Sequence, residues 1–293
     1  MMALPADRPL RGIVYMILSA CGFSAMSVTG KWLAADYAVP QIMFFRALFV
    51  LLPILALILM QRNPALLRTQ HLSGHFWRSL VGTISMFCLF YSFYLLPLAD
   101  AIAVGFMGPV FSTLFAIIFL REPALRRHWI ALGAGFVGVL VMTRPGGGVV
   151  NWLGLGVALA GTVFYGLAHT HIRRLGRTES PLTTVYFFSL FVIAATALML
   201  PWVWKQPTSA QDWGLLIITG CFAFIGQLFL TKSYQYAPAA TVSPFNYSGL
   251  IWAVIFGYLL WDEQPTPPIF LGATIVMAAG VYLAWSENRQ CSI

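Results

Sequence analysis

Long apolar segments recur along the chain, and short polar segments separate them. Each apolar segment runs for about 17–24 residues, and a helix of that length crosses about 30 Å of hydrocarbon. The segments are twice too long for the alternating strands of a membrane barrel and are apolar on all faces, so α-helices are predicted. Ten spans are predicted, at residues 12–34, 39–60, 76–96, 99–120, 128–144, 152–172, 181–204, 213–236, 239–261 and 269–286.

The amino-acid composition supports a membrane protein independently of this pattern. Of the 293 residues, 59% are hydrophobic and only 9% are charged, which is too few charges to cover a soluble globule. The first apolar segment is too long for the core of a secretory signal and continues directly into the second. No cleavable signal is therefore expected.

The second half of the chain repeats the first at an offset of 141 residues, so that residues 91–99 align with residues 232–240 and Glu122 with Glu263. Each half contains five predicted spans, and an odd number of spans forces the two copies into opposite orientations in the bilayer. The predicted fold is an all-α polytopic membrane protein of ten transmembrane helices, arranged as two inverted five-helix repeats. The two predicted units are residues 1–147 and residues 148–293.

Basic residues predict the orientation, because Lys and Arg accumulate in cytoplasmic loops. With the amino terminus inside, twelve of them are cytoplasmic and three are outside, so both termini are expected to be cytoplasmic. The net charge of +8 is therefore a topology signal and not a nucleic-acid patch. The twelve, expected in solvated loops or against lipid headgroups, are Arg8, Arg11, Arg62, Arg68, Arg78, Arg121, Arg126, Arg127, Arg173, Arg174, Arg177 and Arg289. The three are Lys31, Arg144 and Lys205.

Two pairs of motifs sit at corresponding places in the repeats. Leu-Pro-Leu-Ala-Asp-Ala at 96–101 pairs with Ala-Pro-Ala-Ala-Thr-Val at 237–242, and Arg-Glu-Pro at 121–123 pairs with Asp-Glu-Gln-Pro at 262–265. With the ten spans, these motifs resemble the drug/metabolite transporter superfamily, and within it the EamA-type branch, which includes bacterial amino-acid and metabolite exporters. The resemblance covers almost the whole chain. It implies alternating access around a central cavity lined by spans 1, 3, 4, 6, 8 and 9, with spans 5 and 10 at the periphery.

The paired turns contain a proline at which one helix ends and the next begins within two or three residues. Under the resemblance, the turn at Pro97 is expected to act as the outer gate and the turn at Pro238 as the inner gate. The alternative is that the prolines only make compact loops. Glu122 and Glu263 lie at helix ends, so they are expected to hold each hairpin to its neighbour rather than to carry protons.

Two charged residues lie at least about one helical turn inside predicted spans, and an ionised Arg or Lys costs about 2.5–3.5 kcal/mol at a helix centre. Arg46 is interpreted either as a structural residue bound to helix-end carbonyls or as a functional one. Lys232 lies near the inner end of its span and could extend its ammonium group to the interface. Alternatively, Lys232 faces the cavity and attracts a substrate carboxylate, with Tyr91 across the pseudo-symmetry axis.

The other candidate substrate-binding residues are uncharged or aromatic. Each taken singly is as well explained by helix packing. Together they predict an amphipathic cavity suited to a small zwitterionic or amphipathic solute. They are Ser24, Thr83, Phe87, Tyr91, Tyr94, Tyr165, His169, Gln227, Ser243, Asn246 and Tyr247.

Several chemistries find no support in the sequence. No Asp or Glu lies in the middle of a predicted span, so facilitated diffusion is the simpler mechanism, although His169 could carry protons. There is no hydrolase motif or nucleotide-binding domain, and the four cysteines show no CxxC spacing, so neither an enzyme, a cofactor nor a metal site is expected. The glycine-rich Pro145–Gly148 segment is interpreted as a linker between the repeats.

The predicted function is export of amino acids, with aromatic or bulky neutral ones preferred, or of related metabolites across a bacterial inner membrane. The expected partners are this small-molecule substrate and membrane lipid, without nucleic acid, and the expected assembly is a monomer. The alternatives are a proton-coupled drug/metabolite antiporter and a membrane sensor or enzyme that transports nothing.

Overall fold

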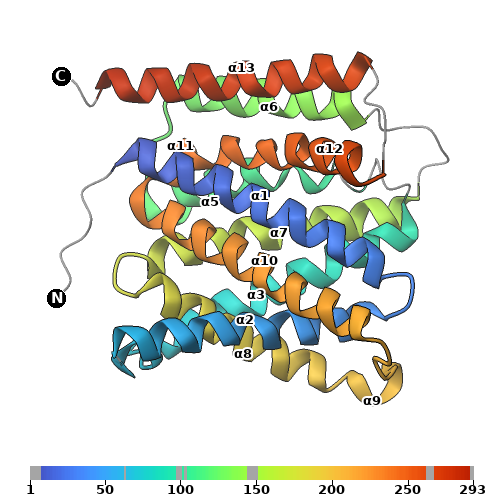
Figure 1. Cartoon of the computed structure of the whole chain (residues 1–293). Coiled ribbons are helices and arrows are strands. Elements are labelled where there is room, and N and C mark those ends of the chain that lie inside the picture. Colours follow the sequence, from blue (N-terminus) through green and yellow to red (C-terminus); the bar gives the residue numbers. More distant parts are fainter. Residues whose placement is uncertain are drawn as a thin grey trace.

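A computed structural model describes residues 8–62, 64–96, 101, 104–143, 151–261 and 267–290. All regular structure in these ranges is helical, which confirms the predicted all-helical class (Figure 1). The longer helices are α1 (Pro9–Leu33), α2 (Val39–Gln61), α3 (Leu72–Leu95), α5 (Gly108–Leu120), α6 (Arg126–Thr143), α7 (Trp152–Leu175), α8 (Pro181–Ala197), α10 (Ala210–Tyr236), α12 (Ser248–Trp261) and α13 (Pro267–Gln290). The short elements are η1 (Pro64–Leu67), α9 (Leu200–Val203), α11 (Ala239–Val242) and η2 (Ser243–Tyr247).

Six helical segments in the described ranges are long and apolar enough to cross a membrane. These are α1, α2, α7, α10, the segment Ala239–Leu260 and α13, and α5 and α8 are shorter apolar helices. Where both ends can be compared, most helices begin and end within a few residues of the predicted spans. The number of crossings and the orientation of the termini stay predictions.

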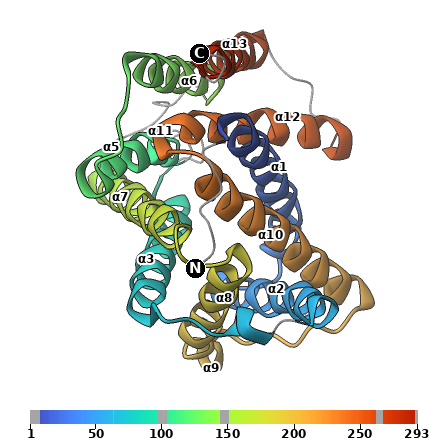
Figure 2. The same cartoon turned by 90° about the vertical axis from the view of Figure 1, so that its left-hand side faces the viewer.

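The helices that pack most extensively are α1 with α10 and α3 with α7. The 141-residue offset relates α1 to α7 and α3 to α10. The α1–α10 pair in one arrangement therefore corresponds to the α7–α3 pair in the other. The same exchange relates the packing of α5 on α7 to that of α12 on α1. Helices α6 and α13 pack on each other and form a separate layer at one side of the bundle (Figures 1 and 2). This is the peripheral position expected for the fifth and tenth spans.

Small residues let the central helices approach closely. Gly22 of α1 lies against the backbone of Gly226 of α10, where an added Cβ would come within 2.9 Å of the Gly226 nitrogen. The hydroxyl of Ser19 donates a hydrogen bond of 2.8 Å to the carbonyl of Gly226. In the corresponding pair of helices, Ser85 donates to the carbonyl of Gly161 at 2.8 Å. Such contacts associate helices in lipid, where hydrophobic burial cannot.

The predicted span 239–261 is not one regular helix. It consists of α11, the 3-10 turn η2 and α12, and Pro244 lies inside η2. Proline supplies no N–H to a helix ladder, which favours this tighter turn. Three residues complete a turn of a 3-10 helix, so Ser243 and Asn246 share a face while Tyr247 points elsewhere. Tyr247, another candidate site residue, packs over Gly135 of α6.

We expect Gly22→Ala to destabilise the protein by about 1–3 kcal/mol, because the methyl group has no room against the α10 backbone. The control is Gly30→Ala in the same helix, where an added Cβ meets nothing within 4 Å. It should leave stability unchanged or raise it by up to about 1 kcal/mol through the lower backbone entropy of the unfolded chain. Thermal unfolding in detergent measures both variants. Equal melting temperatures would contradict the close α1–α10 contact.

Candidate functional site

Polar side chains from several helices meet around His169 and form what is here called the tyrosine–histidine cluster. Tyr165 and His169 lie one helical turn apart on the same face of α7. The other members are Ser112 of α5, Tyr234 of α10, and Ser243 and Asn246 of η2. The cluster brings together residues from both halves of the chain.

Two hydroxyl groups surround one ring nitrogen of His169. Its Nδ1 lies 3.1 Å from the hydroxyl of Tyr234 and 3.3 Å from that of Ser112. The hydroxyl of Tyr234 is also 3.3 Å from that of Ser243. A hydroxyl can donate to Nδ1 or accept from it, so either neutral tautomer of His169 is bound by this network. His169 is 5% exposed, so the network lies inside the protein.

Tyr165 connects this network to η2. Its hydroxyl accepts a hydrogen bond of 2.8 Å from the amide of Asn246, and its ring centroid lies 3.8 Å from that of His169. Gly108 at the start of α5 makes room for the tyrosine ring, since an added Cβ there would come within 2.7 Å of it. Tyr165 and Asn246 were both predicted site residues, and the structure brings them into direct contact.

Two arginines lie buried on other helices, Arg46 of α2 at 8% exposure and Arg78 of α3 at 3%. Arg78 donates from Nη2 to the side-chain oxygen of Gln227 at 3.2 Å, and its guanidinium lies 3.5 Å from the ring centroid of Phe188. Arg46 contacts the sulfur of Met86 at 2.9 Å. The expectation that Arg78 is a solvated loop residue is therefore wrong: α3 begins at Leu72, which places Arg78 almost two turns inside the helix.

A buried ion cluster ties together the ends of α5, α7 and α10 and the start of α11. Glu122 accepts a hydrogen bond of 2.6 Å from Nε of Arg173 and one of 3.1 Å from the backbone N–H of Ala239. Arg173 also donates to the carbonyls of Tyr234 and Gln235. The prediction that Glu122 holds a hairpin to its neighbour is confirmed. Arg173 is 7% exposed, so its expected position in a solvated loop is wrong.

The backbone at the end of α5 positions Glu122. Arg121 adopts the left-handed conformation with φ 54°, which ends the helix and turns the chain back toward the bundle. The N–H of Glu122 then bonds to the carbonyl of Ala116 at 3.3 Å. Arg173 follows His169 by four residues on α7, so one face of that helix serves both the ion cluster and the tyrosine–histidine cluster.

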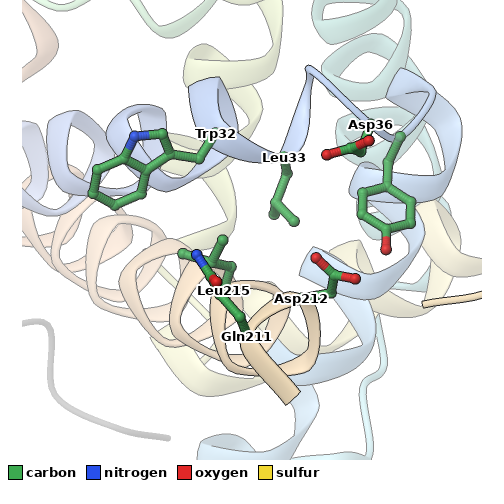
Figure 3. Close-up of a pocket in the computed structure, with 7 residues that line it drawn as sticks. Trp32, Leu33, Asp36, Gln211, Asp212 and Leu215 are labelled. Atoms are coloured by element: carbon green, nitrogen blue, oxygen red, sulfur yellow. The ribbon is translucent and has the colours of Figure 1, made fainter. Parts of the chain in front are cut away.

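A pocket of about 390 Å³ lies at the opposite end of α10 from the ion cluster. It is formed by the end of α1, the loop that follows and the start of α10, and Asp36 and Asp212 place carboxylates around it (Figure 3). Tyr37 also lines the pocket, where burial raises the pKa of its phenol to about 12 and hydrogen bonding to Asp212 adds to this effect. The neighbouring Lys205 bonds to Asp36 at 2.9 Å.

Other predicted site residues lie apart from the tyrosine–histidine cluster. Lys232 lies two residues from Tyr234 on α10 and therefore on nearly the opposite face, with its ammonium 5.6 Å from the ring centroid of Tyr15. Tyr91 is 54% exposed. Ser24 donates to the carbonyl of Gly249, and Phe87 packs with apolar residues of α2 and α8. Thr83 is buried, and its hydroxyl has no partner.

Parts of the prediction fall outside the described residues. These are Pro97, Arg144, Pro145–Gly148, Glu263 and the side chain of Tyr94. Pro238 is described and precedes α11, at the turn that Glu122 holds. Among the described residues, no three His, Cys, Asp or Glu side chains gather as a metal site would require.

The sequence analysis missed Ser112 and Tyr234 as site residues. Ser112 lies in a strongly apolar stretch, and nothing in the sequence distinguishes it from a packing residue. Tyr234 aligns with Phe93 in the repeat. The repeat therefore drew attention to this segment but gave no reason to select the hydroxyl of Tyr234. Arg78 had a usable signal, because the predicted span 76–96 already included it.

Comparison with known proteins identifies related transporters. The EamA-like transporter family matches the chain twice, over residues 10–144 and 152–285. The pseudopaline exporter of Pseudomonas aeruginosa is 28% identical, covering 94% of this chain and 97% of that protein. The riboflavin transporter of Vibrio cholerae is 24% identical, covering 96% and 95%. The S-adenosylmethionine uptake transporter of Rickettsia felis is 26% identical, covering 97% and 95%.

The fold is also found among solved structures. One crystal structure matches with a TM-score of 0.76 at 18% identity and covers 96% of this chain and 97% of that one. The agreement extends over nearly the full length of both chains, so the architecture described here is an established one.

We expect Arg173→Met to lower the free energy of unfolding by about 3–5 kcal/mol, because it leaves the carboxylate of Glu122 buried without its main partner. The matched control is Lys205→Met, which removes an ion pair whose side chains are 55% and 63% exposed. Exposed pairs contribute about 0–1 kcal/mol. Thermal unfolding in detergent at low salt measures both. A loss for Arg173→Met no larger than for Lys205→Met would show that the ion cluster does not stabilise the fold.

Proposed function

The chain belongs to the EamA-like transporter family, and from this premise we propose that it exports amino acids or similar small metabolites by alternating access. As a member of this family it is a multi-pass membrane transporter for small molecules and not an enzyme. The observation that carries the proposal is the tyrosine–histidine cluster, which is buried, polar and contributed by both halves of the chain.

The packing of the helices supports an inverted-repeat mechanism, and the location that we propose is the inner membrane of a bacterium. The α1–α10 and α3–α7 pairs exchange under the offset between the halves, as expected if a pseudo-two-fold axis lies in the membrane plane. In such transporters the substrate site lies at the interface of the repeats near the midplane. His169 and Tyr165 lie well inside α7, at a depth that fits this position.

The chemistry of the cluster supports an amino acid or similar zwitterion as cargo. The site offers hydroxyl groups that donate or accept, the amide of Asn246, and the aromatic faces of Tyr165 and Tyr234. Hydroxyls and amides orient a solute without fixing its net charge, and aromatic rings favour a bulky apolar side chain. Aromatic and bulky neutral amino acids are therefore the preferred substrates. The relatives include both an exporter and uptake transporters, so the direction proposed rests on the sequence resemblance.

The ion cluster supports Pro238 as part of the inner gate. Glu122 caps the start of α11 while Arg173 binds the end of α10, so the turn between those helices is held from both sides. The cycle we propose breaks the Glu122–Arg173 contact when this end opens. The pocket at the other end of α10 fits a state in which the outer end is partly open.

A flux experiment tests this function. The purified protein in liposomes should equilibrate L-phenylalanine or L-tryptophan, and an imposed proton gradient should change the rate little beyond its effect on the substrate. We expect no dependence of the rate on a titrating carboxylate, because no described carboxylate lies among the residues of the tyrosine–histidine cluster.

His169 is the group that could make the mechanism proton-coupled. The comparison therefore includes His169→Gln, which keeps a polar side chain without titration. Uphill uptake driven by the gradient in the wild type and abolished in His169→Gln would establish the proton-coupled antiporter instead. Absence of flux for amino acids, sugars, nucleotides and cationic dyes alike would favour a sensor.

The orientation has its own test. In a background without native cysteines, Thr178→Cys should react with impermeant reagents only from the cytoplasmic side, and Ala35→Cys only from outside. Both positions are exposed and lie in loops at opposite ends of the helices. Labelling from the reversed sides would overturn the topology predicted from the basic residues.

A further inference from the structure

Arg46 and Arg78 lack the partners that buried cations normally have. Nε of Arg46, and Nε and Nη1 of Arg78, are buried and have no hydrogen-bond partner. The contacts they do make are with a thioether, a neutral amide and the face of a phenyl ring. None of these neutralises a positive charge, and the ion pairs in the described part of the chain involve other residues.

The two cations border the same packed group of side chains. Arg46 contacts Met86 and Arg78 lies over the ring of Phe188, and both Met86 and Phe188 belong to the cluster built around Met43 and Val192. Arg173 shows what a structural arginine looks like in this protein, with a carboxylate at 2.6 Å and two backbone carbonyls. Two like charges that are buried and mostly unpartnered are costly to a fold and are typical of functional sites in membrane helices.

One unused nitrogen of Arg78 lies where the two halves of the chain meet. Nη1 of Arg78 lies next to Gly82 on α3, where an added Cβ would be 3.6 Å from that nitrogen and 3.7 Å from Cβ of Ala168 on α7. The same Cβ would lie 3.3 Å from the ring of Phe188 on α8. Ala168 directly precedes His169 on α7, so Arg78 lies where α3 contacts α7 at a residue adjacent in sequence to the tyrosine–histidine cluster.

We propose that Arg46 and Arg78 together form the subsite that binds the carboxylate of the transported substrate. Guanidinium N–H groups form strong hydrogen bonds with carboxylate oxygens, and a carboxylate supplies the counter-charge that both arginines lack. Gln227 holds Arg78 through Nη2. Nε and Nη1 lie on opposite edges of the guanidinium plane, so each leaves a separate N–H donor for a ligand. Phe188 beneath the guanidinium limits it to movement in its own plane.

This inference extends the proposed function and rests on it in one respect, namely that the bound carboxylate belongs to a transported substrate. It assigns one end of the cargo to the arginines and the other end to the tyrosine–histidine cluster. A substrate that carries a carboxylate would then be selected over the same molecule as an amide. Lys232, which the sequence suggested for this role, is held against the rings of Tyr15 and Phe229 on another face of α10.

The test measures binding without transport. The probes are 3-phenylpropanoate and its neutral analogue 3-phenylpropanamide, titrated against the full-length protein in detergent at constant ionic strength. Thermal stabilisation gives the affinity for each. We expect the wild type to bind the carboxylate at least tenfold more tightly than the amide. Arg46→Gln and Arg78→Gln should each reduce that ratio to between one and two.

The matched control is Arg68→Gln, which makes the same change of charge at an exposed position and should keep the wild-type ratio. Arg46→Met is the second variant, because the side-chain partner of Arg46 among the described residues is the thioether of Met86. Without ligand, its melting temperature should be equal to or above that of the wild type. A structural arginine would instead lower it by several degrees, and that result would overturn the proposal.

Three other outcomes would also overturn it. These are equal binding of carboxylate and amide by the wild type, an undiminished ratio in both Arg→Gln variants, and equal stabilisation by chloride, which would make the pair an inorganic-anion site. Flux of L-phenylalanine in liposomes is measured separately. Loss of the binding ratio in the variants, together with no flux of any solute in the wild type, would keep the anion subsite and reject the transport function.

Discussion

A polar group inside an apolar helix bundle must find its hydrogen-bond partner within the protein, because the hydrocarbon around it supplies none. The helix contacts here follow from that constraint. Ser19, Ser24, Ser85 and Ser233 each donate to a backbone carbonyl of a neighbouring helix at 2.7–2.8 Å. Glycines such as Gly22 bring the backbones close enough for these bonds to form. Directional contacts of this kind determine which helices pair, because hydrophobic burial within a membrane gives little preference for one helix partner over another.

The same constraint separates two kinds of buried charge. Glu122 and Arg173 satisfy each other and several backbone groups, and they join four helix ends at one side of the bundle. Arg46 and Arg78 lie deeper along their helices and leave three nitrogens unused. A satisfied pair stabilises one arrangement of the helices, whereas an unsatisfied pair needs an anion to complete it. This difference is the basis for assigning a gating role to the first pair and a binding role to the second.

Single helices connect the ion cluster, the tyrosine–histidine cluster and the contact of Arg78. Tyr165, His169 and Arg173 follow one another at intervals of four along α7, and Gln227 and Tyr234 lie two turns apart on α10. A rigid movement of α7 relative to α10 would therefore change the ion cluster and the tyrosine–histidine cluster together. Such coupling is what alternating access requires, since the occupied site and the gate must respond to one another.

Much of the fold could be predicted from the sequence, because a membrane helix needs about twenty apolar residues and that requirement is visible in the chain. The repeat offset and the family could also be predicted, from the aligned segments and the paired motifs. The role of Glu122 in holding a hairpin was predicted from its position at a helix end. The inward face of each helix could not be predicted. Helices that are apolar all round carry no amphipathic pattern to mark it, so Lys232 was chosen although Tyr234, two residues on, is the residue that meets His169.

The burial and the partners of the arginines, and the conformation of η2, depend on the tertiary structure. Arg78 and Arg173 look like loop residues in a count of basic positions, and only the packed helices reveal that both are buried, one with a carboxylate and one without. Likewise, Pro244 signals an irregularity, but the 3-10 turn that sends Asn246 toward Tyr165 and Tyr247 toward α6 depends on the neighbours available to each side chain. The sequence by itself determined which segments are helices and how they repeat, since length and apolarity are local properties. The site was decided by the tertiary structure, because partners distant in sequence make it.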